Sequence, residues 1–417
     1  MPEKTEHLQS EKWCFRGFLT PFSFFKAFNL NNHHHQINNA SDIKFLDIKD
    51  LDLSSKHFEN NNQETTYYQS LLKNGTLHYV ENIEAKFKLL KVGDFTFPIL
   101  ITSDNYENSY VCSPFGNYVL LGIESLQEIK NRFLKKLGRF GINIFGKILK
   151  ASSINSAIYI NHSLLSTDLQ PNDLHKNHIK TIVSFLKKKY PQHAIIFRSI
   201  NSYTCPEIKQ NLKLCDFHFI ASRQIYLTDV SDLNLLQTRI IKSDLKLWKE
   251  KTYEVVEGND LTYDDELRIL NLYKMNAIEH HSSLNPQINI HFVQLLKKNS
   301  IFQFKALRKN GLIEGVVGYY IKDKIFHCAL IGYDRQNASS NQIYRLLSIM
   351  LLLEASKTAN TFHQSAGASI FKKIRRAKSF QEYQAIYTKH LNWKQKFSWT
   401  FIKLILNIFA IRFMKKY

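Results

Sequence analysis

The best candidates for catalytic residues in this sequence lie between Asp334 and Glu382. Four of them, Asp334, Tyr344, His363 and Glu382, have side chains that can accept or donate a proton. His363 ends a short apolar run directly before the residues QSAG, where its side chain would face the start of the next helix. The competing interpretation of His363 is a structural residue whose ring bonds to a backbone carbonyl in a strand. The competing interpretation of Tyr344 is a ring that packs against the sheet.

Two basic residues follow at a spacing that places them on one helix face. Lys372 and Arg375 are three positions apart, which is the separation of neighbours on a helix surface. Together they could hold a carboxylate or a phosphate, because arginine offers a planar set of donors and lysine a compact charge. The competing interpretation is a solvated face, which is the ordinary place for such residues.

The elements that position these residues can be read from the pattern of apolar residues. Apolar and polar residues alternate on both sides of Lys322–Lys324, which predicts a hairpin. Apolar residues then recur at helical spacing from near Ser340, and a helix at Ala368–Ala377 lies between short strands at Thr361–Gln364 and Glu382–Thr388. A strand that leads through a polar loop into a helix leaves unpaired amide groups at the helix N-terminus, which attract anions.

This order of elements resembles half of the fold of the GNAT-superfamily N-acyltransferases, whose polar loop wraps the pyrophosphate of an acyl-CoA. Their loop usually reads Gln/Arg-x-x-Gly-x-Gly/Ala; here the Arg is present and both glycines are replaced, by Ala338 and Ser340. The resemblance implies a donor site of Arg335, Ala338, Ser340, Asn341 and Arg345. The later run FHQSAGASIFKKIRRAKSFQEYQAIYTKHL is similar to the branch known as BioF-associated or Fem-like, in which the blocks SAGA and IYRLL recur.

The same order of elements occurs earlier in the chain, from Leu77 to about Asp229. Strands are predicted in LHYVENIEAKFKLLKVGDFTFPILIT, YVCSPFGNYVLLG, AIYINHSLLSTDL, HAIIFRSIN and FHFIASRQIYLTD, and helices in ESLQEIKNRFLKKL and near Asp173–Lys189. With the resemblance, this predicts an α/β protein of two tandem GNAT-like domains, each with a mixed central sheet flanked by helices. The predicted boundaries are a polar arm at 1–75, a first, degenerate domain at 76–232, a linker at 233–259, a second domain at 260–392 and a basic amphipathic helix at 393–417.

The resemblance also assigns roles to the remaining candidates. His363, Tyr344 and Glu382 are expected to handle the proton, and the expected substrate contacts are Asn285, Asp334, Ser365, Lys372, Arg375 and Arg198. Asn285 lies in the loop HSSLNP, which overhangs the acceptor cleft in the family, and Pro286 holds it extended. Arg198 and Arg223 are strand positions between apolar residues, and because a buried arginine needs a partner, structural pairing is the first interpretation of both.

Acyl transfer in this superfamily proceeds by direct attack of the amine, so the protein must orient two substrates and move one proton. No covalent nucleophile is needed, and Ser163 and Ser166 lack the G-x-S-x-G elbow of hydrolases. We therefore expect an N-acyltransferase that uses acyl-CoA as a co-substrate, with acyl-carrier protein or aminoacyl-tRNA as other donors and a small or lipid-linked amine as acceptor. Two alternatives stay open: a Fem-like or lipid-aminoacylating transferase that uses aminoacyl-tRNA, and an inactive GNAT-like protein that binds a membrane or an RNA.

The composition is that of a globular protein, because 44% of the 417 residues are hydrophobic, and the length suits two domains. The five cysteines are odd in number and have no metal-ligand spacing, which predicts a reducing compartment and no bound metal. The histidines of NLNNHHHQINNASD lie among asparagines and predict a solvated loop. The amino terminus lacks the pattern of a secretory signal, so a cytoplasmic location is expected, with nucleic acid as a partner only if tRNA is the donor.

Two stretches carry most of the formal net charge of +20: Lys130–Lys150 contributes +7, and Ala366–Tyr417 contributes +11. In the first, basic residues fall on one helical side and apolar residues on another, which predicts a helix that lies on an anionic membrane. Those apolar residues are Phe133, Leu134, Leu137, Phe140, Ile144, Phe145 and Ile148. The carboxyl end contains charges within its apolar run and two tryptophans, Trp393 and Trp399, so lying in the interface is favoured over crossing the bilayer. The alternative is that both helices cover the protein's own core.

Overall fold

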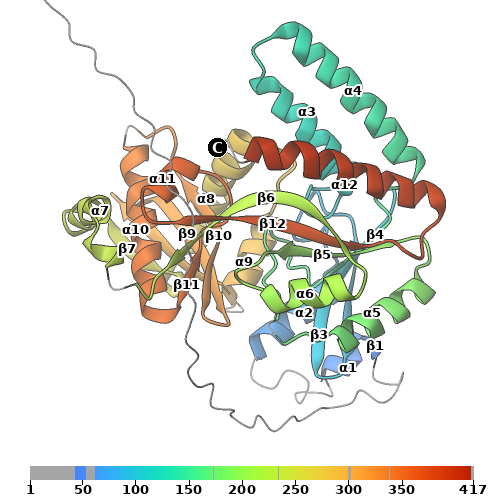
Figure 1. Ribbon diagram of the computed structural model, residues 1–417. Coiled ribbons are helices and arrows are strands. Elements are labelled where there is room, and N and C mark those ends of the chain that lie inside the picture. The colour runs from blue at the N-terminus through green and yellow to red at the C-terminus, as the bar shows by residue number, and fades with distance from the viewer. Residues whose placement is uncertain are drawn as a thin grey trace, which may run out of the picture. The chain divides into compact units, whose positions relative to one another are not determined.

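The computed structural model describes residues 43–52, 62–171, 173–232, 234–298, 302–337 and 339–414 (Figure 1). Most of the arm predicted at 1–75, including the histidine-rich tract, lies outside these residues, and so does Ala338. The described residues belong to one unit that spans Asn39–Tyr417.

A mixed sheet with helices on its faces confirms the predicted α/β class. In the described residues the sheet has twelve strands in the order β1-β2-β3-β4-β5-β12-β6-β11-β10-β9-β8-β7. The strands are β1 (Ile43–Leu46), β2 (Lys86–Val92), β3 (Phe95–Thr102), β4 (Ala157–Ile160), β5 (Ala194–Ile200), β6 (His218–Asp229), β7 (Glu254–Glu257), β8 (Gln303–Lys309), β9 (Leu312–Lys322), β10 (Ile325–Tyr333), β11 (Thr361–His363) and β12 (Lys378–Tyr387).

The strand order contains one topology twice. In the first set, β1 to β4 are antiparallel neighbours, β4 pairs with β5 in parallel, and β5 pairs with β12 in antiparallel fashion. In the second set, β7 to β10 repeat the antiparallel order, β10 pairs with β11 in parallel, and β11 pairs with β6. The predicted duplication is therefore present, but each set is completed by a strand from the other half of the sequence. The domain boundaries near 232 and 260 stay a prediction.

Two tight hairpins set the register of the second set. Asn310 and Gly311 between β8 and β9, and Asp323 and Lys324 between β9 and β10, all have positive φ angles. Two-residue turns of this kind match the twist of the flanking strands, and Asn and Asp tolerate the left-handed region better than most residues. The second turn confirms the hairpin predicted around Lys322–Lys324.

Eight of the described helices pack in three groups. The 19-residue helix α10 buries residues at helical spacing, such as Ile343, Leu347 and Met350, against the second strand set, where α7 joins it. Helices α5 and α6 cover one face of the first set, and α2, α8, α9 and α12 pack in the cluster that joins the two sets. The helices are α1 (Ile48–Asp52), α2 (Asn62–Asn74), α3 (Leu121–Ser125), α4 (Arg132–Ala151), α5 (Lys176–Lys189), α6 (Pro206–Leu214), α7 (Arg239–Lys249), α8 (Tyr263–Tyr273), α9 (Ile290–Lys298), α10 (Ser340–Thr358), α11 (Ser369–Lys373) and α12 (Trp393–Met414), with π-helical turns at Gly116–Leu120 and Lys274–His281 and 3-10 turns at Leu126–Glu128, Leu235–Gln237 and Gly258–Asp260.

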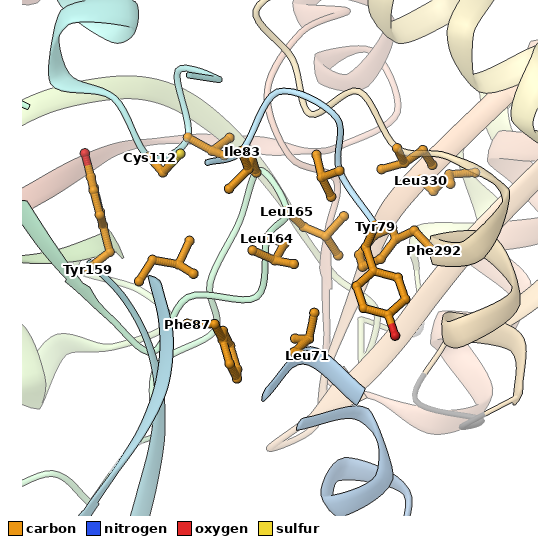
Figure 2. Close-up of a cluster of buried hydrophobic side chains, with 14 of the residues drawn as sticks. Leu71, Tyr79, Ile83, Phe87, Cys112, Tyr159, Leu164, Leu165, Phe292 and Leu330 are labelled. Carbon is orange, nitrogen blue, oxygen red and sulfur yellow. The ribbon is translucent and has the colours of Figure 1, made fainter. Parts of the chain in front are cut away.

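The cluster that joins the two strand sets is centred on the loop after β4. Figure 2 shows Leu164 and Leu165 of this loop between Tyr159 of the first set and Leu330 of the second. All four side chains are at most 5% exposed. Burial of such side chains stabilises each by about 1.5–3 kcal/mol relative to an exposed position, so the loop ties the halves together.

Two predictions for the segment after β3 are wrong. YVCSPFGNYVLLG was expected to form a strand, but turns at Tyr110–Cys112 lead into the π-helical turn and α3, because buried apolar residues alone do not distinguish a helix from a strand. The single helix predicted in ESLQEIKNRFLKKL is broken at Asn131. The Asn131 side chain accepts hydrogen bonds from Phe133 N at 2.9 Å and Leu134 N at 3.1 Å, which starts α4.

Helix α12 packs on the sheet along β6, where the Asn407 amide bonds to Phe219 O at 3.2 Å and accepts from Ala221 N at 3.3 Å. Trp399 is 1% exposed and therefore lies in the core, whereas Trp393 is 73% exposed. The interpretation of both tryptophans as headgroup anchors thus fails for Trp399. Among the described helices, none is long and apolar enough to cross a bilayer.

Candidate functional site

The sheet opens where β10 outruns its parallel neighbour β11. The two strands pair only from Ile325 to His327, against Thr361 to His363. Beyond His327, β10 continues to Tyr333 with β9 on one side and no strand on the other in the described sheet, and a bulge lies between Cys328 and Leu330. In the first set the corresponding strand β4 ends at Ile160, its last paired residue. At the corresponding junction of the first set, β4 does not extend beyond its pairing with β5, whereas β10 leaves an edge that a bound chain could pair with.

Lys372 lies in this opening and is 6% exposed. Its Nζ donates to Gln364 O and Ala366 O, both at 2.7 Å, which fixes it beside the residues that follow β11. Burial, with the charge of Arg223, lowers the pKa of Lys372 to about 7. The neutral amine has two N–H groups and one lone pair, so both N–H groups are used by these carbonyls and the lone pair remains to accept a proton.

Two histidines close the base of the opening. His363 of β11 and His327 of β10 are 1% and 0% exposed, and their Nδ1 atoms are 3.1 Å apart. Ser365 N donates to His363 Nδ1 at 3.1 Å, while His327 Nε2 is buried without a partner among the described residues. Burial lowers the pKa of His327 to about 3, and burial with the charges of His327 and Arg223 holds the pKa of His363 well below its ordinary value. Both rings are neutral near pH 7, which makes His363 a weak base.

The central strands β6 and β12 contribute an ion pair next to the histidines. Arg223 and Glu382 face each other in the register, and Arg223 Nε donates to Glu382 Oε1 at 2.7 Å. Arg223 also donates to Thr167 Oγ1 at 2.6 Å, and Glu382 Oε2 is buried without a partner in the described part of the chain. The charge of Arg223 lowers the pKa values of Lys372, His327 and His363.

Tyr344 lies on the far side of the opening, in the first turns of α10. Its ring centroid is 4.7 Å from that of Phe371 and 5.4 Å from that of Tyr333. Burial raises the pKa of Tyr344 to about 12, so the phenol keeps its proton and can act only as a donor near neutral pH. The ring of Tyr344 is packed, as the alternative interpretation predicted, and these contacts involve the ring and not the hydroxyl group.

The predicted anion loop leads from β10 to the N-terminus of α10. Arg335 is exposed and donates to Tyr333 Oη at 2.8 Å, and Asn341 is exposed in the first turn. Ser340 begins the helix, and no side chain caps its N-terminus. Asp334 is paired with Arg268 at 2.6 Å and also accepts from Gln336 N, so it shapes the loop. The amide groups at this end remain suited to an anion.

Arg345, predicted for the donor site, and Arg375, predicted as a substrate contact, are both paired within the structure. Arg345 and Arg375 both bind the buried Asp244 of α7, each with an Nε to carboxylate distance of 2.7 Å. Arg375 also lies 3.5 Å from the Phe371 ring centroid. These contacts fix α7, α10 and the segment after α11 to one another, and they engage the guanidinium groups that were expected to bind donor and substrate.

Arg198 and Asn285 likewise bond to their own chain. Arg198 donates to Asp168 Oδ2 at 2.8 Å and to Ser166 O at 2.9 Å, which holds the loop after β4. The Asn285 amide donates to Ala277 O at 2.8 Å and Ser282 O at 3.2 Å, where the helix preceding HSSLNP ends. Ser365 contributes its backbone to the site, since its φ is 58° and its carbonyl accepts from Tyr226 N.

Sequence reasoning missed His327, which stands beside His363, and Asp244, which joins the two arginines. The alternation of IFHCAL places His327 on a strand, but a parallel register is set by tertiary packing and has no local sequence signal. Among the described residues, no group of His, Cys, Asp and Glu could hold a metal ion.

Two surface hollows lie outside the opening. One of about 390 Å³ is lined by Tyr203, Asp323 and Asn360, at the opposite end of the β10 and β11 pairing. The other, of about 740 Å³, is open and lined by Arg239, Lys373 and Arg376. Neither hollow is lined by Lys372 or by the histidine pair. The candidate site is therefore defined by the side chains around the opening between β10 and β11.

The comparisons with known proteins match structures and no sequences, since neither a protein family nor a curated protein is matched. A tandem GNAT protein from the clavulanic acid biosynthesis pathway is 8% identical, covers 82% of this chain and 98% of its own, and has a TM-score of 0.39. FemX is 10% identical over 51% of this chain and 78% of its own, with a TM-score of 0.40. L-PGS from Bacillus licheniformis is 12% identical over 51% of this chain and 73% of its own, with a TM-score of 0.40. The assignment of function therefore rests on the residues of this chain.

Proposed function

We propose that this protein is an N-acyltransferase that transfers an acyl group from a thioester to an amine by direct attack. The supporting observation is the opening between β10 and β11, which contains a buried lysine with a pKa of about 7 and ends at the N-terminus of α10. An open strand edge, a base and an anion-binding helix end along one strand suit a donor with amide groups and a phosphate.

The donor in this proposal is an acyl-CoA. Its pyrophosphate lies at the N-terminus of α10, where Arg335 adds a positive charge, and the amides of its pantetheine arm pair with β10 beyond His327. The thioester then reaches the bulge between Cys328 and Leu330, where Lys372 and Tyr344 flank it. The replaced loop glycines limit how closely the backbone approaches the phosphates, so we expect weaker donor binding than a glycine loop gives.

The chemical step moves one acyl group and one proton. The amine nitrogen attacks the thioester carbonyl carbon, the new C–N bond forms and the C–S bond breaks. Neutral Lys372 accepts the proton that the attacking nitrogen releases, through the lone pair that its two carbonyl partners leave free. The CoA thiolate departs and accepts a hydrogen bond from Tyr344, whose raised pKa keeps the phenol protonated. The proton held by Lys372 then passes to the sulfur, which restores the neutral amine.

Binding of the donor tests this proposal. Calorimetry with acetyl-CoA and longer acyl-CoA thioesters should show binding, and Arg335→Glu should weaken it at least tenfold, about 1.4 kcal/mol, because a charge-assisted contact becomes repulsive. Lys213→Glu is the control, since it makes the same change of charge on the exposed end of α6.

Two results would redirect the assignment. If no CoA thioester binds at millimolar concentration, the acyl-CoA donor is rejected. Preference for aminoacylated over uncharged tRNA at physiological salt would then support the aminoacyl-tRNA alternative, because non-specific binding to a basic protein does not distinguish the two. Absence of both would support a GNAT-like binding protein without turnover.

A further inference from the structure

Helix α4 exposes a continuous apolar stripe. Phe133 is 72% exposed, Phe140 is 65% exposed and Leu137 is 56% exposed. These three residues, with Ile144 and Ile148, recur every three or four positions and so fall along one side of the helix. Leu134 adds to the stripe at its first turn and is also more than half exposed.

The stripe is not the side by which α4 packs on the protein. Gly138 faces Leu126, and Gly146 faces Phe115 and Val119, so the glycines allow a close approach on the other side. Phe145 also contacts the protein, with its ring centroid 5.6 Å from that of Phe401 in α12. Figure 1 shows α3 and α4 standing away from the sheet beyond α12. The expectation that α4 covers its own core holds for this packed side only, and the exposed stripe has no cover in the described chain.

Basic side chains border the stripe. No acidic residue occurs from Lys130 to Lys150. Five cations have no ion-pair partner among the described residues, whereas Lys150 lies over the rings of Tyr106 and Phe115. The five are Arg132, Lys135, Lys136, Arg139 and Lys147. The helix therefore presents aromatic and aliphatic side chains beside an uncompensated positive charge.

We propose that α4 is a docking helix for an anionic phospholipid bilayer and lies in the plane of the headgroups, with its apolar stripe toward the acyl chains. Charge complementarity selects this occupant, because the lysines and arginines beside the stripe meet anionic headgroups while the phenylalanines enter the layer beneath. A second copy of the same helix would bring like charges together with no acid to pair them. The inference does not depend on the acyltransferase proposal, since no residue of the opening takes part.

Vesicle flotation with the full chain tests the inference. The wild type should float with phosphatidylcholine vesicles that contain phosphatidylglycerol and should remain unbound with phosphatidylcholine alone. Raising the salt from about 0.1 M to about 1 M should release it, because the Debye length falls from about 10 Å to about 3 Å. Failure to float with anionic vesicles at low salt would overturn the proposal.

Three variants separate the contributions. Phe133→Asp with Phe140→Asp removes the apolar anchors, and Lys136→Glu with Arg139→Glu reverses two charges; each pair should lower the fraction bound at least tenfold. Leu214→Asp is the matched control, because Leu214 is 60% exposed on α6, and it should bind as the wild type does. Equal loss in all three would reject α4 as the docking helix.

Light scattering after size-exclusion chromatography excludes the competing occupant. The wild type and the phenylalanine pair should have the same mass in solution. A wild-type dimer that the phenylalanine pair dissociates would assign the stripe to a second copy of the chain and overturn the bilayer proposal. Circular dichroism and acyl-CoA binding by the same variants should match the wild type, so a failure of docking can be told apart from a failure of the donor site.

Discussion

The Nδ1 atoms of His327 and His363 lie 3.1 Å apart on neighbouring parallel strands. His363 Nδ1 accepts a hydrogen bond from Ser365 N, so this nitrogen carries no proton. His327 Nε2 is buried without a partner in the described chain. The pair orients Ser365, and in the proposed reaction the proton passes to Lys372.

The histidine pair should make folding sensitive to acid. His327 has a pKa of about 3 in the folded protein and about 6.5 when unfolded, so the unfolded chain binds the extra proton between these values. The contribution of neutral His327 to the free energy of unfolding is therefore fully present above about pH 6.5. It is lost as the pH falls toward 3, and the loss is about 2 kcal/mol at pH 5. Urea unfolding at pH 7 and pH 5 should show a smaller difference for His327→Gln than for the wild type. His78→Gln, at an exposed histidine, should keep the wild-type difference.

Lys372 should control the pH dependence of turnover. Because the neutral amine is the active form, kcat/KM should rise with pH and level off above about 7. Lys372→Arg keeps the charge but cannot lose its proton, so kcat should fall by about 10²–10⁴ while circular dichroism stays unchanged. Lys373→Arg is the control on the same helix. A Lys372→Arg variant that retains full kcat would rule out lysine as the base.

Glu382 should act on Lys372 through Arg223. Glu382→Gln retains an acceptor for Arg223 Nε but leaves the buried guanidinium uncompensated, and this lowers the pKa of Lys372 further. The acidic limb of the pH–rate profile should then move to lower pH. Glu382→Ala removes the partner altogether and should destabilise the fold by about 3–5 kcal/mol. An unmoved acidic limb in Glu382→Gln would limit Glu382 to a structural role.

Asp244 should be a stability determinant rather than part of the donor site. Asp244→Ala leaves Arg345 and Arg375 without their shared carboxylate, and we expect a loss of about 1–3 kcal/mol in urea unfolding. Lys246→Ala on the same helix breaks only an exposed pair with Glu250, so its effect should stay within about 0.5 kcal/mol. Equal effects of the two substitutions would contradict the structural role.

The sequence was sufficient for elements with local signals. The hairpin around Lys322–Lys324 and the start of α10 at Ser340 were predicted because turn residues and helical periodicity act within a few positions. The side chains that Arg345 and Arg375 bind were not predictable, since Asp244 lies about a hundred residues from Arg345 in the chain. The burial of Lys372 could not be predicted for the same reason, because the carbonyl groups that accept its hydrogen bonds are placed by the packing of α11 against β11.

The exchange of β6 and β12 between the two strand sets has a consequence for synthesis on the ribosome. When the first set emerges, β5 lacks its neighbour β12, and β6 lacks both of its neighbours, until residues 361–387 have been made. Three strand edges, one of β5 and two of β6, therefore stay open during most of translation, and open edges are sites of wrong pairing and aggregation. Pairs so distant in sequence also form slowly. Cutting the chain between the halves would separate each set from its last strand, so neither half is a self-sufficient folding unit.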